Sequence, residues 1–159
     1  DRMMNPHRAH ALTRWVSTCA IVAIVPMLSI ASKSPATARQ SASRTVWDSV
    51  YSLSQAARGE STYAKTCARC HGASLTGGDE SPPLTGGGFL GNWNGLPLSD
   101  LQTRIKTTMP TDSVGIYDRQ LITDVIAFLL KANGFPAGQS ALPSDLDPLK
   151  EIVIQSSKP

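Results

Sequence analysis

Two thiols and an imidazole stand close together near the middle of the chain, in the motif Cys67-Ala68-Arg69-Cys70-His71. Thiols three positions apart near the end of a helix can each form a thioether bond with a vinyl group of the same porphyrin. The adjacent imidazole is then presented to the metal from that side. This C-x-x-C-H spacing is the attachment signature of c-type haem. The motif therefore predicts one covalently bound haem c, with Cys67 and Cys70 as attachment points and His71 as an axial iron ligand.

Two other interpretations of the cysteine pair fit the sequence less well. A thioredoxin-like redox pair is expected in a βαβ context, and no such pattern surrounds Cys67 and Cys70. Half of a zinc site would need a further Cys or His downstream of His71, and none follows. The other two histidines, His7 and His10, belong to the N-terminal segment.

A second iron ligand is expected beyond His71, and Met109 is the best candidate. No other Met, Cys or His follows position 71, which leaves Met109 and the lysines. Met109 stands in Thr107-Thr108-Met109-Pro110, where the proline is expected to end the preceding helix. A thioether opposite an imidazole is the Met/His pair of electron-transfer cytochromes, which raises the reduction potential. The alternative is a core methionine at a helix end.

The N-terminal part has the pattern of a targeting segment. Arg8 and Arg14 precede an uncharged apolar stretch over residues 15–31, which is followed by Ala36-Thr37-Ala38. This pattern predicts a secretory signal peptide over residues 1–38 and a periplasmic protein. The apolar stretch is at the short limit for a bilayer span, so retention as an inner-membrane anchor stays an alternative. Cys19 is interpreted as a residue of this segment, and residues 39–53, rich in serine, as a linker.

The charge of the chain gives no sign of a nucleic-acid partner. The net charge of +3 comes from the N-terminal segment, because residues from Arg39 onward carry eleven Lys and Arg against eleven Asp and Glu. A basic face is therefore not indicated. Membrane association is expected only if the N-terminal segment is retained.

Periodicity after residue 54 predicts an all-α domain of three to four helices with long irregular loops. Helices are expected over residues 55–66, from Ser99 toward Thr108, and over residues 117–133 with Gly134 as C-cap. The last helix is expected to cross the first, with Tyr63 and Phe128 near Gly59. The domain is assigned to residues 54–135, and residues 136–159 are expected to pack on it as an extension with one helical turn near Pro148. No strand is predicted.

The Gly- and Pro-rich segment 72–97 is predicted to be a loop that a haem would organise. Residues 82–86 are well placed to cover the His71 side, where a backbone carbonyl could accept the Nδ1 proton. Phe89 and Leu90 are candidates for apolar cover. Asn92 and Trp93 are candidates for hydrogen bonds to a propionate, although Trp93 could equally be a partly buried aromatic residue without a special role.

These motifs together resemble class I cytochromes c, in particular bacterial periplasmic monohaem proteins associated with dehydrogenases. The resemblance covers about residues 54–135 and includes the segment from Asp124 to Pro136. It implies the cytochrome c fold around one haem, attachment at Cys67 and Cys70, axial ligands His71 and Met109, and a Pro82 carbonyl bonded to His71. The lysine-rich face of the mitochondrial protein is absent, so its partner preferences are not transferred.

The leading functional hypothesis is an electron carrier that performs no bond chemistry on a substrate. Its expected partners are redox proteins: a dehydrogenase as donor, and an oxidase or another cytochrome as acceptor. The first alternative is the haem-bearing subunit of a larger periplasmic dehydrogenase complex. A haem sensor or peroxidase, in which Met109 dissociates from the iron, is the third hypothesis.

Overall fold

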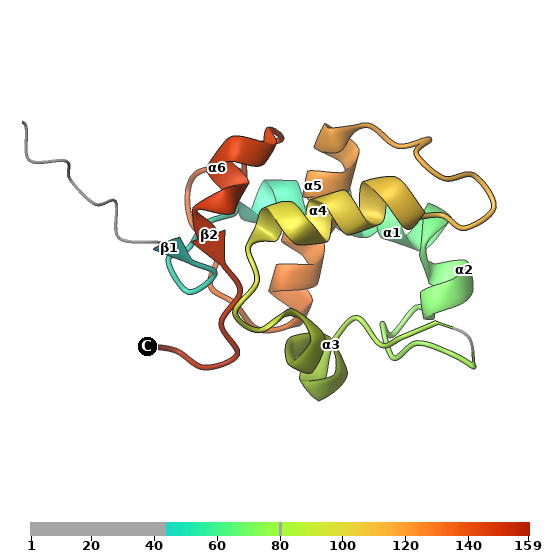
Figure 1. The fold of residues 1–159 in the computed structure, drawn as a ribbon, viewed down its shortest axis with the longest axis horizontal. Helices are drawn as coiled ribbons and strands as arrows, with labels where there is room; N and C mark the ends of the chain where they lie inside the picture. Colours follow the sequence, from blue (N-terminus) through green and yellow to red (C-terminus); the bar gives the residue numbers. More distant parts are fainter. Residues whose placement is uncertain (1–43, 80) are drawn as a thin grey trace, which may run out of the picture. The chain divides into compact units, whose positions relative to one another are not determined.

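The computed structural model describes residues 44–79 and 81–159. The segment interpreted as a signal peptide, Cys19 within it and the first residues of the expected linker lie outside the described residues. Six helices and two short strands follow one another along the described chain: β1 (Arg44–Thr45), α1 (Leu53–Thr66), α2 (Ala68–His71), α3 (Gly86–Trp93), α4 (Leu98–Thr108), α5 (Arg119–Ala132), α6 (Leu146–Lys150) and β2 (Ile152–Val153). The prediction of a helical fold is confirmed, but the described chain has six helices where three to four were expected, and a strand pair that was not predicted; Figure 1 shows the arrangement.

Helices α1 and α5 form the central packing contact. Gly59 lies directly against the backbone of α5, since a Cβ atom there would be 1.8 Å from the carbonyl oxygen of Asp124. One turn further along, the rings of Tyr63 and Phe128 lie 5.3 Å apart. At the exposed rim of the contact, Arg58 donates hydrogen bonds to both carboxylate oxygens of Asp124. The predicted crossing of the last long helix over the first is thus confirmed.

Local sequence explains where these two helices begin. The side chain of Ser52 accepts a hydrogen bond from the backbone of Gln55, and Asp118 caps α5 by accepting from the backbone of Leu121. Gly134, with a φ of 81°, follows the end of α5. Both N-caps lie close to the predicted helix starts, so the expected and observed ranges differ by only a few residues.

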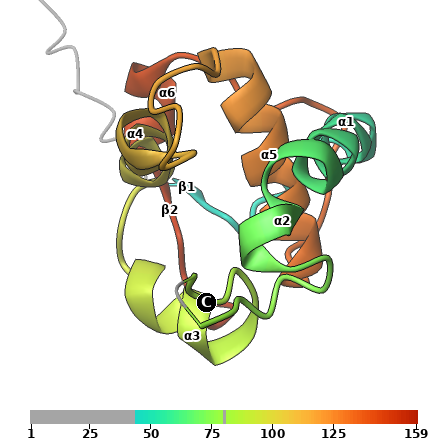
Figure 2. The same ribbon diagram turned by 90° about the vertical axis from the view of Figure 1, so that its right-hand side faces the viewer.

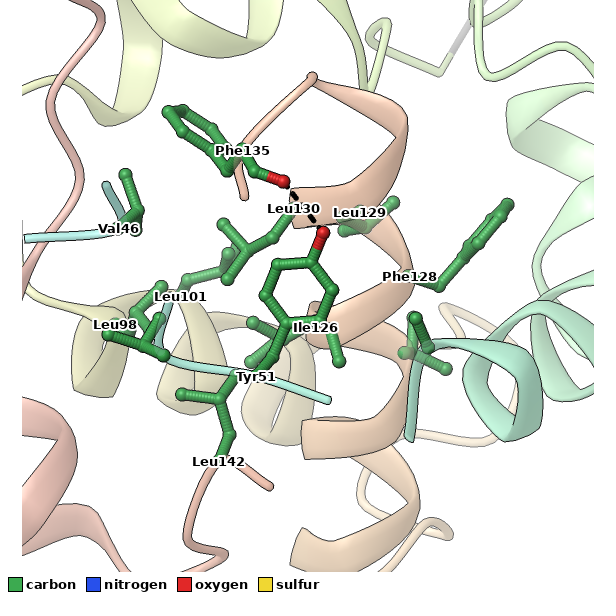
Figure 3. Close-up of a cluster of buried hydrophobic side chains, with 14 of the residues drawn as sticks. Val46, Tyr51, Leu98, Leu101, Ile126, Phe128, Leu129, Leu130, Phe135 and Leu142 are labelled. Atoms are coloured by element: carbon green, nitrogen blue, oxygen red, sulfur yellow. Dashed lines mark hydrogen bonds between the residues drawn. The ribbon is translucent and has the colours of Figure 1, made fainter. Parts of the chain in front are cut away.

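The segment expected to link the N-terminal part to the domain is not a linker where the structure describes it. Val46, Val50 and Tyr51 are buried, and Tyr51 donates a hydrogen bond to the carbonyl of Phe135 (Figure 3). Strand β1 pairs in parallel with β2, with Arg44 opposite Ile152. Serine content suggested a linker, but the apolar residues between the serines are covered by the C-terminal segment.

Residues 136–159 pack on the helices. Leu142, Leu149, Ile152 and Ile154 are all buried. The buried amide of Gln55 forms two hydrogen bonds with the backbone of Leu142, donating to its carbonyl and accepting from its N–H. The predicted helical turn near Pro148 is present as α6.

The predicted loop over residues 72–97 contains a helix, α3, which the glycines at positions 86–88 concealed. Its first N–H, of Gly86, donates to the side chain of Asn133 at the end of α5, and Phe89 is fully buried. Figure 2 shows α3 and α4 on one side, and α1, α2 and α5 on the other. Among the described residues, no helix combines the length and apolar character that a membrane span requires.

Candidate haem site

The attachment motif forms a short helical turn directly after α1. Cys67 is both the C-cap of α1 and the N-cap of α2. Helix α2 ends at His71 because Gly72 follows with a φ of 76°. The Cys67 thiol is half-buried and the Cys70 thiol is exposed, and both are free. Burial raises the pKa of the Cys67 thiol, while its hydrogen bond with Thr66 opposes this shift. The two thiols are therefore held on one turn and are available for thioether bonds.

The His71 ring is oriented by the loop that follows it. Its Nδ1 atom lies 3.0 Å from the carbonyl oxygen of Pro82, the contact that the family resemblance implies. With Nδ1 carrying the proton that the carbonyl accepts, the Nε2 atom keeps its lone pair for a metal. The loop can return to His71 because Gly77 has no side chain. Gly77 adopts a φ of 77°, and a Cβ atom at this position would lie 2.3 Å from the carbonyl oxygen of Ser81.

Tyr63 connects α1 with the same loop. Its hydroxyl donates a 2.7 Å hydrogen bond to the carbonyl of Gly72, the residue after His71. Burial, with a smaller contribution from the Cys67 thiolate, raises the pKa of Tyr63 to about 12. Tyr63 therefore stays a neutral donor at physiological pH and holds the end of α2 in place.

Met109 approaches from a different element. It caps the C-terminus of α4, is half-buried, and precedes Pro110 through a cis peptide bond. Met109 lines the same cleft as Cys67, Cys70 and His71. The structure thus brings together all four residues that the sequence predicted to hold the haem.

The cleft between these residues has a volume of about 770 Å³, within the range of cofactor pockets. Its walls are largely apolar and come from α4, α5 and the loops on either side of α3: Leu84, Leu96, Leu101, Ile105, Leu121, Ile122, Val125 and Leu129. An apolar cleft that also offers two thiols, an imidazole and a thioether fits a flat, iron-containing macrocycle attached through sulfur. The donor set of this site therefore suits haem c.

Polar groups of the cleft include one that the sequence did not indicate. Asn92 and Trp93, the predicted propionate partners, both line the cleft, and so does the exposed guanidinium-bearing Arg104 of α4. Arg104 precedes Met109 by five residues, and only the helical geometry of α4 shows that both face this space. Phe89, expected to cover a haem, instead lies in the core against Trp93, with 6.4 Å between ring centres.

Comparisons with known proteins give one family match and one similar solved structure. A family model described as cytochrome c oxidase, cbb3-type, subunit III matches residues 54–129, a range that includes Cys67, Cys70, His71 and Met109. No curated protein matches the chain in sequence. One similar solved structure is the sulfane dehydrogenase SoxCD from Paracoccus pantotrophus, with 24% identity and a TM-score of 0.45. That match covers 67% of this chain and 61% of the other, less than two thirds of its length.

Proposed function

We propose that this chain, which matches a cytochrome family model over residues 54–129, is a class I c-type cytochrome and carries single electrons by means of one covalent haem held at the iron by His71 and Met109. The observation that carries the proposal is the shared cleft, in which Cys67, Cys70, His71 and Met109 all line an apolar space. When bound, haem supplies an iron that alternates between the ferric and ferrous states by gaining and losing one electron.

Attachment to the protein is assigned to Cys67 and Cys70. The whole sequence holds three cysteines and one C-x-x-C-H motif, which supports one haem for each chain. Thioether bonds from a single helical turn would keep the cofactor in place in a cleft that exposed residues such as Asn92 and Arg104 also line. The protein therefore does not depend on affinity alone to retain it.

The axial pair is assigned to His71 and Met109. The Pro82 carbonyl fixes the tautomer and the ring orientation of His71, which makes its Nε2 atom a better ligand. As an iron ligand, the Met109 thioether would favour the ferrous state and raise the reduction potential. If His71 and Met109 both bound the iron, the apolar walls around them would leave no open position for water or small ligands.

The polar rim is assigned to the propionates. Arg104, Asn92 and Trp93 line the cleft and offer five guanidinium protons, an amide and an indole N–H. A guanidinium binds a carboxylate through two parallel hydrogen bonds, which makes Arg104 the strongest of the three. This side of the cleft would orient the cofactor without a covalent bond.

We place this carrier in the periplasm, on the basis of the signal-like pattern over residues 1–38. Its partners are redox proteins, with a dehydrogenase as donor and an oxidase or another cytochrome as acceptor. The name of the matched family, an oxidase subunit, favours a docked relay within a larger complex as a second form of the same function. In this role the chain performs no bond chemistry on a substrate.

Replacing Met109 tests the proposal. A thioether–iron(III) bond produces a weak red absorption band, so wild-type protein should show this band and bind CO slowly in the ferrous form. The Met109→Ala variant should lose the band, bind CO rapidly and have a lower reduction potential. Leu96→Ala is the matched control, since Leu96 lines the cleft without a ligand atom. Identical spectra of wild type and Met109→Ala would show that another group binds the iron, and fast CO binding by wild type would favour a sensor or peroxidase.

A further inference from the structure

The segment between Met109 and α5 has little backbone structure of its own. Within residues 110–117, backbone hydrogen bonds join Ser113 to Pro110 and Ile116 to Ser113. Val114 and Ile116 are 54% and 65% exposed, so burial of apolar side chains does not anchor this loop at its tip. A loop that begins at a metal ligand and lacks such anchors needs another means of keeping its shape.

Lys106 supplies that anchor. It lies in the last turn of α4, three residues before Met109, and its side chain is only partly exposed. Its ammonium donates hydrogen bonds to two loop carbonyls, at 2.7 Å to Gly115 and at 2.5 Å to Tyr117. The chain from Lys106 through Met109 to Tyr117 is thus closed into a ring by one side chain. Hydrogen bonds from a charged donor are about twice as strong as neutral ones.

A second contact joins the loop to the attachment motif but is weaker. Arg69, between the two cysteines, pairs with Asp112 at 2.6 Å, and both side chains are more than half exposed. Ion pairs of this kind contribute little to stability because water and salt screen them. Lys106, by contrast, is partly shielded and contacts carbonyls rather than a mobile carboxylate. The position of the loop therefore depends mainly on Lys106.

We propose that Lys106 is a positioning residue for the distal ligand: its ammonium holds the 110–117 loop closed and thereby keeps the Met109 thioether at the wall of the haem cleft. Tyr117, whose carbonyl Lys106 binds, lines the same cleft as Met109, so the ring acts on the cleft at both of its ends. This inference rests on the assignment of Met109 as an iron ligand. It adds a residue that would not touch the iron but would set how readily the thioether leaves it.

The test compares Lys106→Leu with Lys106→Arg and with Lys65→Leu. Leucine keeps an apolar stem and a helix-forming side chain but removes the donors, whereas arginine can still donate to both carbonyls. Lys65, exposed in the last turn of α1, gives a control with the same change of charge and residue type. The readout is the rate of CO binding by the ferrous protein, which requires Met109 to dissociate. We expect the ferrous Lys106→Leu variant to bind CO about tenfold faster than wild type. The CO-binding rates of the other two variants should stay close to that of wild type.

Limited proteolysis of the loop gives a measurement that does not involve the iron. Cleavage between Asp112 and Tyr117 should become faster in Lys106→Leu and stay unchanged in Lys65→Leu. If Lys106→Leu fails to fold, Lys106→Gln, which keeps a single amide donor, takes its place. Equal CO-binding rates and equal cleavage in all variants would overturn the role of Lys106 while wild type still showed its red band. Wild type without that band would overturn the Met109 assignment and, with it, this inference.

Discussion

Tyr63 connects the attachment turn to the packing of the long helices. Its ring packs on Phe128 of α5, and its hydroxyl donates to the carbonyl of Gly72 beside His71. The side chain is 2% exposed, so a lost hydrogen bond there would leave the carbonyl without its partner. Tyr63 therefore couples the position of α1 to the end of α2, where His71 lies.

Tyr63→Phe tests this connection through the pH dependence of stability. The folded-state pKa of Tyr63 is raised from an ordinary value of 10.0 to about 12, mainly by burial. A raised pKa means that the neutral phenol stabilises the fold fully below pH 10.0, and that this contribution is lost as the pH rises toward 12. At neutral pH the variant should be less stable by about 1 kcal/mol.

The measurement is the free energy of unfolding in guanidinium chloride for wild type and variant across this alkaline range. The difference between them should shrink as the pH rises, because only wild type carries the titrating phenol. Burial, the main cause of the shift, remains after the Cys67 thiol has become a thioether. A difference that stayed constant up to pH 12 would contradict the raised pKa.

At the scale of elements, the crossing of α1 and α5 depends on one position without a side chain. A Cβ at Gly59 would lie 1.8 Å from the Asp124 carbonyl oxygen and 2.4 Å from its carbon, which are backbone atoms that cannot rotate away. The two helices would have to separate to accept it. Since α1 carries the attachment turn and α5 forms one wall of the cleft, such a shift would also widen the haem site.

Gly59→Ala should therefore lower the free energy of unfolding by about 3 kcal/mol or prevent folding. Gly91→Ala is the matched control: Gly91 is also helical, in α3, but a Cβ there meets no atom within 4 Å. The control should gain up to about 1 kcal/mol, because alanine favours a helix over glycine. Denaturant unfolding of both proteins gives the comparison, and equal stability would show that α1 and α5 do not pack as closely as described.

Elements with a strong local pattern could be predicted from the sequence, and the others could not. The spacing of Ala56, Gly59 and Tyr63 indicated the face of α1 that is buried, and Gly134 marked the end of α5. Helix α3 begins with three glycines, whose low helix propensity is overcome by tertiary contacts, including the bond from Gly86 to Asn133. Strands β1 and β2 are far apart in the sequence, and a two-residue pairing leaves no periodic signal.

At the scale of the whole molecule, the segment before α1 contacts the segment after α5. The Trp47 indole donates to the carbonyl of Gln155, and Ser156 donates its N–H to the side chain of Asn94 after α3. The first contact joins a residue before α1 to one after α6, and the second joins the C-terminal segment to the end of α3. The described chain therefore includes segments 44–53 and 136–159 as parts of the fold, although the family model covers residues 54–129.

The part of the candidate site that lies in one short motif could be predicted from the sequence. Cys67, Cys70 and His71 share one motif, and Met109 was left by elimination among soft ligands. Arg104 and Lys106 carried no such signal, because a basic residue on a helix is most often simply solvated. Their roles depend on which face of α4 meets the cleft and where the following loop returns, and both are properties of the folded chain.

The central claim, a haem fixed through two thioethers, is tested most directly by the intact mass of the denatured protein. Wild-type protein and a variant with Cys67→Ala and Cys70→Ala would be produced in a host that matures c-type cytochromes and then unfolded and extracted with organic solvent. The wild-type chain should keep its colour and exceed the polypeptide mass by one haem, and the variant should show the polypeptide mass alone. A colourless wild-type chain with no added mass would contradict the account.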